Sequence, residues 1–226
     1  MASSDVAVPT ARRRPRTSAD LSAQLRTRTR RAHLAVEAAF ALDARLTDPL
    51  AYGALLARLR GYFAKVEDAL ATVTGWDELL PPLDIGSRRR TPLLDADLRQ
   101  LGIDVPRVPE QYGGPGIEPL APDSLARGLG CLYVLEGSAL GGRIVSRRAQ
   151  AALGEQLPVA FFSSAGRGDL GGQWRELKAA LNAFQAQHGS AAGQQVVAAA
   201  YATFASLTAW LDVASIDVAS LDVGER

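Results

Sequence analysis

The stretch CLYVLEGSALGGRIV, residues 131–145, restricts the possible folds more than any other part of the chain. Its apolar residues recur every three or four positions, which predicts a helix, yet it contains Gly137, Gly141 and Gly142. A glycine inside a helix costs about 1 kcal/mol relative to alanine. A helix with three of them is expected to let something approach its backbone closely, either a neighbouring helix or a flat ligand. Both interpretations are open at this point.

Hydrophobic spacing predicts a single all-α domain. Helices are expected at residues 18–40, 49–70, 93–101, 124–153, 172–187 and 191–213. Ser18 and either Asp123 or Ser124 are the expected N-caps of the first and fourth helices, and Pro49 suits the first turn of the second. Only the short run PVAFF at 158–162 alternates weakly like a strand. Pro and Gly residues break the helical pattern at residues 79–92, and residues 102–122 contain too many of them for regular structure.

The two ends of the chain are expected to lie outside this domain. Residues 1–17 form a predicted disordered basic arm, residues 18–213 the helical domain, and residues 214–226 a flexible tail. Eight arginines and one acidic residue, Asp20, lie between Arg12 and Arg31. Because the arm has no interleaved aromatic residues and the chain as a whole carries a net charge of only +1, we expect a solvated tail and no nucleic-acid partner.

Composition limits the cellular setting. Apolar residues make up 47% of the 226 residues, enough for a core, and the single cysteine excludes an internal disulfide. One cysteine is typical of a reducing compartment. No apolar run reaches the roughly 18 residues that a membrane helix needs, and no apolar segment follows Arg16 as a signal peptide would require. We therefore expect a cytoplasmic monomer without a membrane span.

His33 is the strongest candidate for a metal ligand. The chain has only two histidines, which disfavours zinc and carboxylate-bridged di-iron sites. His33 continues the apolar stripe of its helix and should point inward or to the edge of the core. Glu37, one turn later, can orient one ring nitrogen and leave the other for a metal. The alternative is a partly buried histidine satisfied by its helical neighbour.

Basic residues flank this histidine. Arg26 and Arg30 lie on the preceding turns of the same helix, and a cationic edge beside an inward imidazole suits an iron ligand that carries negative groups. Haem, with two propionates, is such a ligand. A flat porphyrin held by His33 would also explain a helix that exposes bare backbone at its glycines. Taken alone, the arginines are equally consistent with a solvated face.

Three segments together resemble one family. The segments LRTRTRRAHLAVE, YVLEGSALGG and ATFASLTAWL resemble the bacterial biliverdin-producing haem oxygenases, and the likeness covers residues 18–212. It implies a single-domain multihelical bundle in which His33 is the proximal iron ligand and Glu37 is its hydrogen-bond partner. The resemblance also implies that Gly137, Gly141 and Gly142 are the glycines of the distal helix.

Further site residues follow from the same resemblance. Arg26 and Tyr133 match residues that contact the haem propionates, and Arg30 and Phe204 complete the expected haem-binding set. Many members carry an aspartate after the first distal glycine, where it organises water. Here Ser138 stands at that position. The water network is therefore expected to rest on Ser138, backbone carbonyls and Glu136.

The implied activity is oxidative cleavage of haem, which is both substrate and cofactor, to biliverdin, CO and ferrous iron. It requires O₂ and an electron donor such as ferredoxin or another reductase. Two alternatives remain. One is a non-catalytic haem carrier or sensor on the same fold, which the missing aspartate favours. The other is a haem-free relative of the thiaminase-like or quinone-cofactor-forming type.

The remaining notable residues have structural interpretations. Cys131 is expected to be a buried small apolar residue and His188 to end a helix. Arg143, Arg147 and Arg148 are expected to be solvated, or else to provide a docking patch for an acidic electron donor. The expected core aromatics are Trp76, Trp174, Tyr201, Trp210 and Phe204, the last of which can also reach a pocket.

Overall fold

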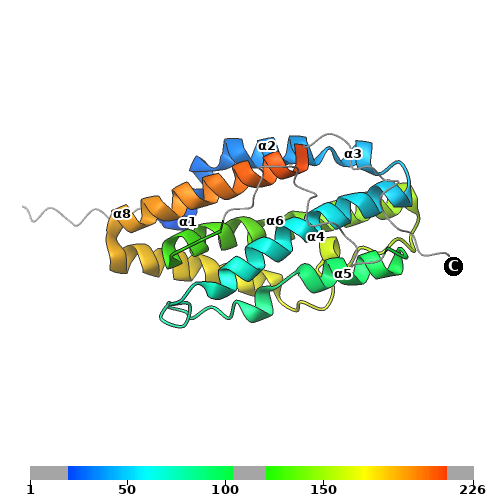
Figure 1. The fold of residues 1–226 in the computed structure, drawn as a ribbon. Helices are drawn as coiled ribbons and strands as arrows, with labels where there is room; N and C mark the ends of the chain where they lie inside the picture. Colours follow the sequence, from blue (N-terminus) through cyan, green and yellow to red (C-terminus); the bar gives the residue numbers. More distant parts are fainter. Residues whose placement is uncertain (1–19, 104–120, 213–226) are drawn as a thin grey trace, which may run out of the picture.

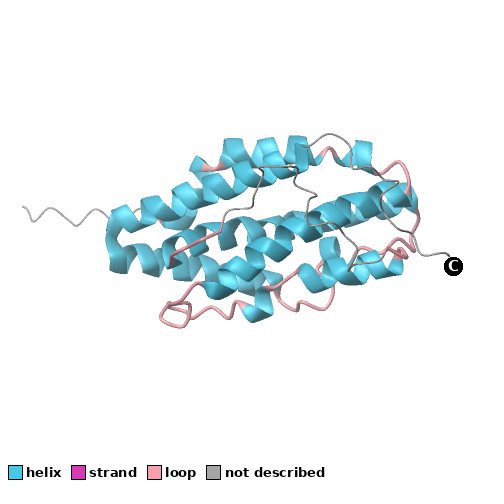
Figure 2. Ribbon diagram, in the orientation of Figure 1, coloured by secondary structure: helices cyan, strands magenta, loops and turns pink. Residues whose placement is uncertain are grey.

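The computed structural model describes residues 20–103 and 121–212. Within these ranges the chain forms helices and contains no strand, which confirms the predicted all-α class (Figure 2). None of the described helices combines the length and apolarity that a membrane span requires. The elements are α1 (Leu21–Arg28), α2 (Arg30–Phe40), α3 (Leu42–Arg45), α4 (Pro49–Thr72), the 3₁₀ turn η1 (Gly86–Arg88), α5 (Thr91–Gln100), α6 (Leu125–Leu153), α7 (Ala160–Ser163) and α8 (Leu170–Asp212).

Some of the expected features fall outside these ranges. The basic arm at residues 1–17, the C-terminal tail at 214–226 and most of the breaker-rich segment at 102–122 lie outside the described residues. The expected N-cap Ser18 does as well. The first helix begins later than expected, and its N-cap is Asp20, whose carboxylate accepts hydrogen bonds from the amides of Ser22 at 2.9 Å and Ala23 at 3.3 Å. An acidic side chain here satisfies amides that the helix leaves without partners.

Helix α4 contributes many buried residues to the core. It begins as predicted, with Pro49 in the first turn and Asp48 as the N-cap. Its apolar face is buried, and a pair of reciprocal contacts ties it to α8. The Trp210 indole N–H donates to the carbonyl of Arg58 at 2.9 Å, and the buried Arg58 side chain donates to the carbonyl of Trp210 at 2.6 Å. The two helices are therefore fixed in register by buried hydrogen bonds as well as by packing.

The run at residues 158–162, which alternates only weakly like a strand, does not form one. Residues Ala160–Ser163 form the helical turn α7. The carboxylate of Asp97 in α5 accepts hydrogen bonds from the amides of Ala160 at 2.7 Å and Phe161 at 2.9 Å. Because a distant carboxylate caps the first turn, the tertiary contact overrides the local β propensity of the run. Burial raises the pKa of this carboxyl group.

Helices α6 and α8 pack against each other over a long contact (Figure 1). At Gly130 of α6 a methyl group would overlap the carbonyl oxygen of Val196 and the amide nitrogen of Ala200 in α8. Only glycine permits this approach. In Figure 1 the C-terminal half of α8, in orange, also runs beside α2, in blue. α8 therefore lies against both α2, which carries His33, and α6, which carries Gly137, Gly141 and Gly142 and is called the glycine helix below.

The two predicted C-terminal helices are one element with a break. α8 runs from Leu170 to Asp212, and Gly189 inside it has φ 83° and ψ 176°. This region of backbone conformation is accessible essentially only to glycine. The expected end of a helix at His188 is therefore a change of direction, and the His188 ring stacks on Phe184 at 4.5 Å between centroids.

We predict that Gly189→Ala destabilises the fold by about 1–3 kcal/mol, because any side chain makes the backbone conformation at this position unfavourable. Urea unfolding followed by circular dichroism measures the change. Ser190→Ala is the matched control, since Ser190 is the next residue in α8 and is exposed. A Gly189→Ala protein as stable as the control would contradict the assigned role of Gly189.

Candidate functional site

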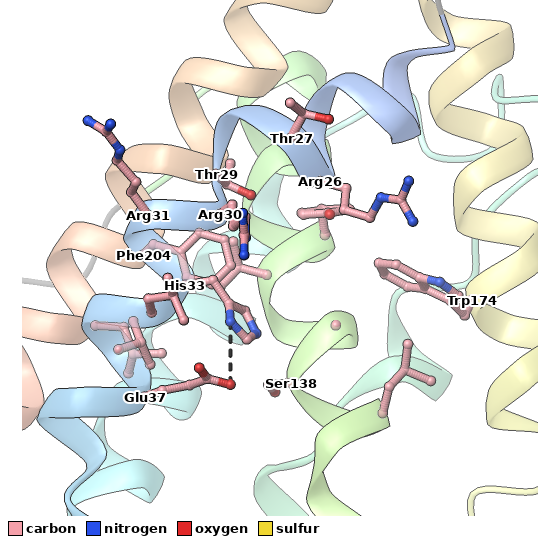
Figure 3. A pocket seen from close by; sticks show the side chains of 17 residues that line it. Arg26, Thr27, Thr29, Arg30, Arg31, His33, Glu37, Ser138, Trp174 and Phe204 are labelled. Carbon is pink, nitrogen blue, oxygen red and sulfur yellow. Dashed lines mark ion pairs between the residues drawn. The ribbon is translucent and has the colours of Figure 1, made fainter.

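A two-lobed cleft lies between α1, α2 and the C-terminal half of α8 on one side and α6 on the other. The larger lobe measures about 980 Å³ and the smaller about 400 Å³. Figure 3 shows the larger lobe, with His33 and Glu37 on one side and Ser138 on the other. The two lobes share His33, Val36, Glu37, Gly137, Ser138 and Leu207. Apart from Glu136, every residue assigned to the site from the sequence lines one lobe or both.

His33 stands on α2 with its ring in the cleft. Its Nδ1 atom lies 3.5 Å from Oε1 of Glu37, and the ring meets Phe204 of α8 edge to face at 5.7 Å between centroids. Among the residues that the structure describes, none forms a hydrogen bond or an ion pair with Nε2 of His33. The side chain is 53% exposed, so it lies at the edge of the core and not inside it. The arrangement holds the ring by one nitrogen and one face and leaves the second nitrogen available.

The glycines at positions 137, 141 and 142 of α6 divide into two kinds. A methyl group at Gly141 would have no atom within 4 Å, and one at Gly137 would contact only the Trp174 indole, at an ordinary 3.8 Å. At Gly142 a methyl group would overlap the backbone carbonyl of Phe162 at the end of α7. Gly137 and Gly141 therefore leave open space in the cleft. Gly142 lines the smaller lobe, but a glycine is needed there because α7 packs tightly against it. Close packing of a neighbouring helix therefore explains Gly142, and open space for a ligand explains Gly137 and Gly141.

The cleft is polar at one end and apolar at the other. Arg26, Arg30 and Arg31 line only the larger lobe, together with Thr27 and Tyr133. Apart from Arg148, the residues found only in the smaller lobe are apolar or glycine: Phe40, Leu42, Leu59, Phe63, Gly141, Gly142, Ile144, Val145, Phe161, Phe162 and Leu211. A ligand with anionic groups on one edge and a hydrocarbon body matches this distribution.

Tyr133 belongs to the cationic end of the cleft. Burial raises the pKa of its phenol, and a hydrogen bond with Thr29 and the charge of Arg26 lower it again in part. The phenol therefore stays protonated at neutral pH and can donate a hydrogen bond. Its ring packs against Trp174 of α8 at 5.3 Å between centroids, which fixes its position at the wall of the larger lobe.

Several expectations for neighbouring residues are wrong. Glu136 does not face the cleft. It is buried, and its carboxylate pairs with Arg167 at 3.2 Å and Arg88 at 3.7 Å. Trp174, expected in the core, lines the larger lobe, and Tyr201 is 54% exposed. Helical spacing alone does not distinguish these faces, because each depends on which neighbour packs against the helix.

Ser138 has a partner that the sequence does not point to. Its hydroxyl donates to the carbonyl of Leu135 at 2.7 Å and accepts from Nη1 of Arg90, also at 2.7 Å. Arg90 comes from the loop before α5 and is only 1% exposed. Arg88 and Arg90 are both buried, and the run of three arginines at residues 88–90 gives no signal that Arg90 is the one that meets Ser138. Only the tertiary fold, and no local pattern in the sequence, brings this guanidinium behind α6.

Comparison with known proteins agrees with this geometry. Residues 19–212 match the family model of the Heme oxygenase family. A heme oxygenase from Xanthomonas campestris pv. campestris (strain 8004) is 34% identical over 152 residues, which span 65% of this chain and 78% of that protein.

The chain belongs to the haem oxygenase family.

Membership makes it a haem-degrading oxidoreductase with the family's all-α fold. The described cleft fits haem on grounds independent of that match. It has an imidazole with an available nitrogen at its edge, bare backbone at Gly137 and Gly141 across from it, and cationic groups gathered at one end. The imidazole corresponds to the iron of haem, the bare backbone to its planar ring, and the cationic groups to its two carboxylates.

We predict opposite effects of adding one methyl group to neighbouring glycines. Gly141→Ala should leave the free energy of unfolding unchanged or raise it by up to about 1 kcal/mol, because alanine favours a helix and the methyl meets open space. Gly142→Ala should lower it by about 1–3 kcal/mol, because the methyl collides with the Phe162 carbonyl. Urea unfolding of the two variants measures both free energies. Equal changes in the two variants would contradict the division of these glycines into two kinds.

Cys131 is confirmed as a buried residue, and we predict that it is chemically inert. Burial raises the pKa of its thiol to about 11, so only about a thousandth of the molecules carry the reactive thiolate at pH 8. Alkylation by iodoacetamide at pH 8 should be slow in the folded protein and fast in urea. Because the chain has one cysteine, mass spectrometry reads the reaction directly. Equal rates in both states would disprove the prediction.

Proposed function

We propose that this haem oxygenase binds haem in the cleft with His33 as the axial iron ligand and opens the ring with O₂ and electrons from a reductase or ferredoxin. The products would be biliverdin, CO and ferrous iron. The observation that carries the proposal is an imidazole with an available nitrogen facing a helix that has no side chains at Gly137 and Gly141. When bound, haem supplies the iron that activates O₂ against its own ring.

The protein's first task would be to hold the iron through His33. Glu37 would accept a hydrogen bond from Nδ1, which lies 3.5 Å from its Oε1 atom. This partner fixes the ring orientation and raises the basicity of Nε2. Phe204 packs against the ring from α8 and would limit its rotation. A neutral imidazole donates less electron density than a thiolate, which disfavours early O–O cleavage.

The second task would be to orient the ring of haem in its plane. Arg26, Arg30 and Tyr133 would receive the propionates at the cationic end, and the apolar lobe would receive the opposite edge. The open backbone at Gly137 and Gly141 would leave room for O₂ beside the bound haem, which is a positioning effect. Ser138 would hold water on that side. Glu136 cannot take this role directly, because its carboxylate is engaged by Arg88 and Arg167.

The second candidate is a haem carrier or sensor without catalysis, favoured by Ser138 at the position where many members carry an aspartate. A single experiment separates the two functions. The purified protein is loaded with hemin, and ascorbate or reduced ferredoxin is then supplied in air while the visible spectrum is recorded. Loss of the haem band with growth of a broad red biliverdin band supports catalysis. Haem that stays intact supports the carrier.

We predict that His33→Ala lowers hemin affinity more than about tenfold and abolishes the native haem spectrum, since it removes the axial ligand. His188→Ala is the matched control. It removes the other histidine, which stacks on Phe184 and lines neither lobe of the cleft. A His33→Ala protein that binds and degrades hemin like the control would disprove the role of His33.

A further inference from the structure

We infer that Arg90 is a positioning residue that, together with the Leu135 carbonyl, restricts the Ser138 hydroxyl to accepting hydrogen bonds from the cleft. The inference rests on the proposed function and adds to it a residue outside the cleft. Arg90 lines neither lobe. Its guanidinium reaches Ser138 from behind the glycine helix, so it acts on the cleft only through that hydroxyl.

The restriction follows from counting donors and acceptors. A serine hydroxyl has one hydrogen to donate and two lone pairs that accept. The hydrogen of Ser138 goes to the carbonyl of Leu135 at 2.7 Å, since a carbonyl can only accept. One lone pair receives Nη1–H of Arg90 at 2.7 Å, since a guanidinium can only donate. One lone pair is left, and Ser138 is exposed on the cleft side.

Arg90 itself is held rigidly. Nη1 also donates to the carbonyl of Leu135 at 3.2 Å, and Nη2 donates to the carbonyl of Phe161 at 3.1 Å. The guanidinium stacks over the Phe161 ring at 4.1 Å and the Phe63 ring at 5.2 Å. Because these contacts come from α4, α6 and α7, the guanidinium cannot turn away without breaking several of them at once.

The charge of Arg90 persists under working conditions. Burial, and then the nearby charge of Arg167, lower its pKa to about 10, while Glu136 and Glu67 counter the shift. The side chain is therefore cationic at neutral pH and always a donor. Ser138 cannot be released by a proton leaving Arg90 in the range where the protein works.

The consequence is a direction for hydrogen bonds in the cleft. A water on Ser138 must give one hydrogen to the hydroxyl, and its second hydrogen is free to point into the space beside Gly137 and Gly141. The serine cannot donate to a ligand itself. Water anchored in this way can donate a hydrogen bond to an iron-bound ligand that accepts one. Ser138 would thus order water in the cleft, as the aspartate at this position does in many family members.

Fluoride titration of the hemin-loaded protein tests this inference, because fluoride on ferric iron accepts hydrogen bonds and its affinity is read from the visible spectrum. Ser138→Ala and Arg90→Met should each weaken fluoride binding about fivefold, the size of one hydrogen bond. The double variant should be no weaker than Ser138→Ala alone, because both act through one hydroxyl. Far-UV circular dichroism checks that each variant is folded.

Arg88→Met is the matched control. Arg88 belongs to the same buried group of charges and pairs with Glu136 and Glu176, but it does not contact Ser138. It should leave fluoride affinity within about twofold of the native protein. If it weakens binding as much as Arg90→Met, or if Arg90→Met still acts in the Ser138→Ala background, the effect is one of charge alone and the inference fails.

The other outcomes are equally decisive. Tighter fluoride binding in Arg90→Met would mean that the hydroxyl donates, and native affinity in Ser138→Ala would mean that it anchors nothing; either overturns the inference. Should Arg90→Met not fold, Arg90→Lys keeps the charge but cannot reach all three acceptors, and it should weaken fluoride binding similarly. Failure of the native protein to bind hemin would instead defeat the proposed function.

Discussion

The close contact of α6 with α8 at Gly130 determines the geometry of the site. Because no side chain separates the helices there, the backbone of α6 lies directly on that of α8. α8 also packs along α1 and α2, and its Phe204 meets the His33 ring. The separation between the imidazole and the glycine helix is thus set by two contacts that share α8.

Glycine serves two purposes in α6. At Gly130 and Gly142 its lack of a side chain lets backbone from α8 and α7 approach, and at Gly137 and Gly141 it leaves space for a ligand. Spacing along the sequence does not separate these uses. Gly141 and Gly142 are neighbours, yet a methyl group meets nothing at one and a carbonyl oxygen at the other. The difference depends on the direction in which each Cβ would point and on what the fold brings there.

Local signals in the sequence predict the helices well and the polar interior poorly. Hydrophobic spacing and Pro49 place α4 correctly, because those forces act within one element. The turn α7 is missed because its cap comes from Asp97, far away in sequence. The same reason hides Arg90 and the inward turn of Glu136. The family resemblance predicted residues that line one cleft, but the sequence did not point to Arg90, the buried residue that contacts Ser138.

The break at Gly189 has a consequence for insertions and deletions. The helical segment before it carries Trp174, and the segment after it carries Phe204, so opposite walls of one cleft depend on a shared change of direction. Adding or removing a single residue in either segment would turn every side chain beyond it by about 100°. Trp174 or Phe204 would then leave the cleft. Length variation among functional homologues should therefore be absent between these two aromatic residues, even where the amino acids themselves vary.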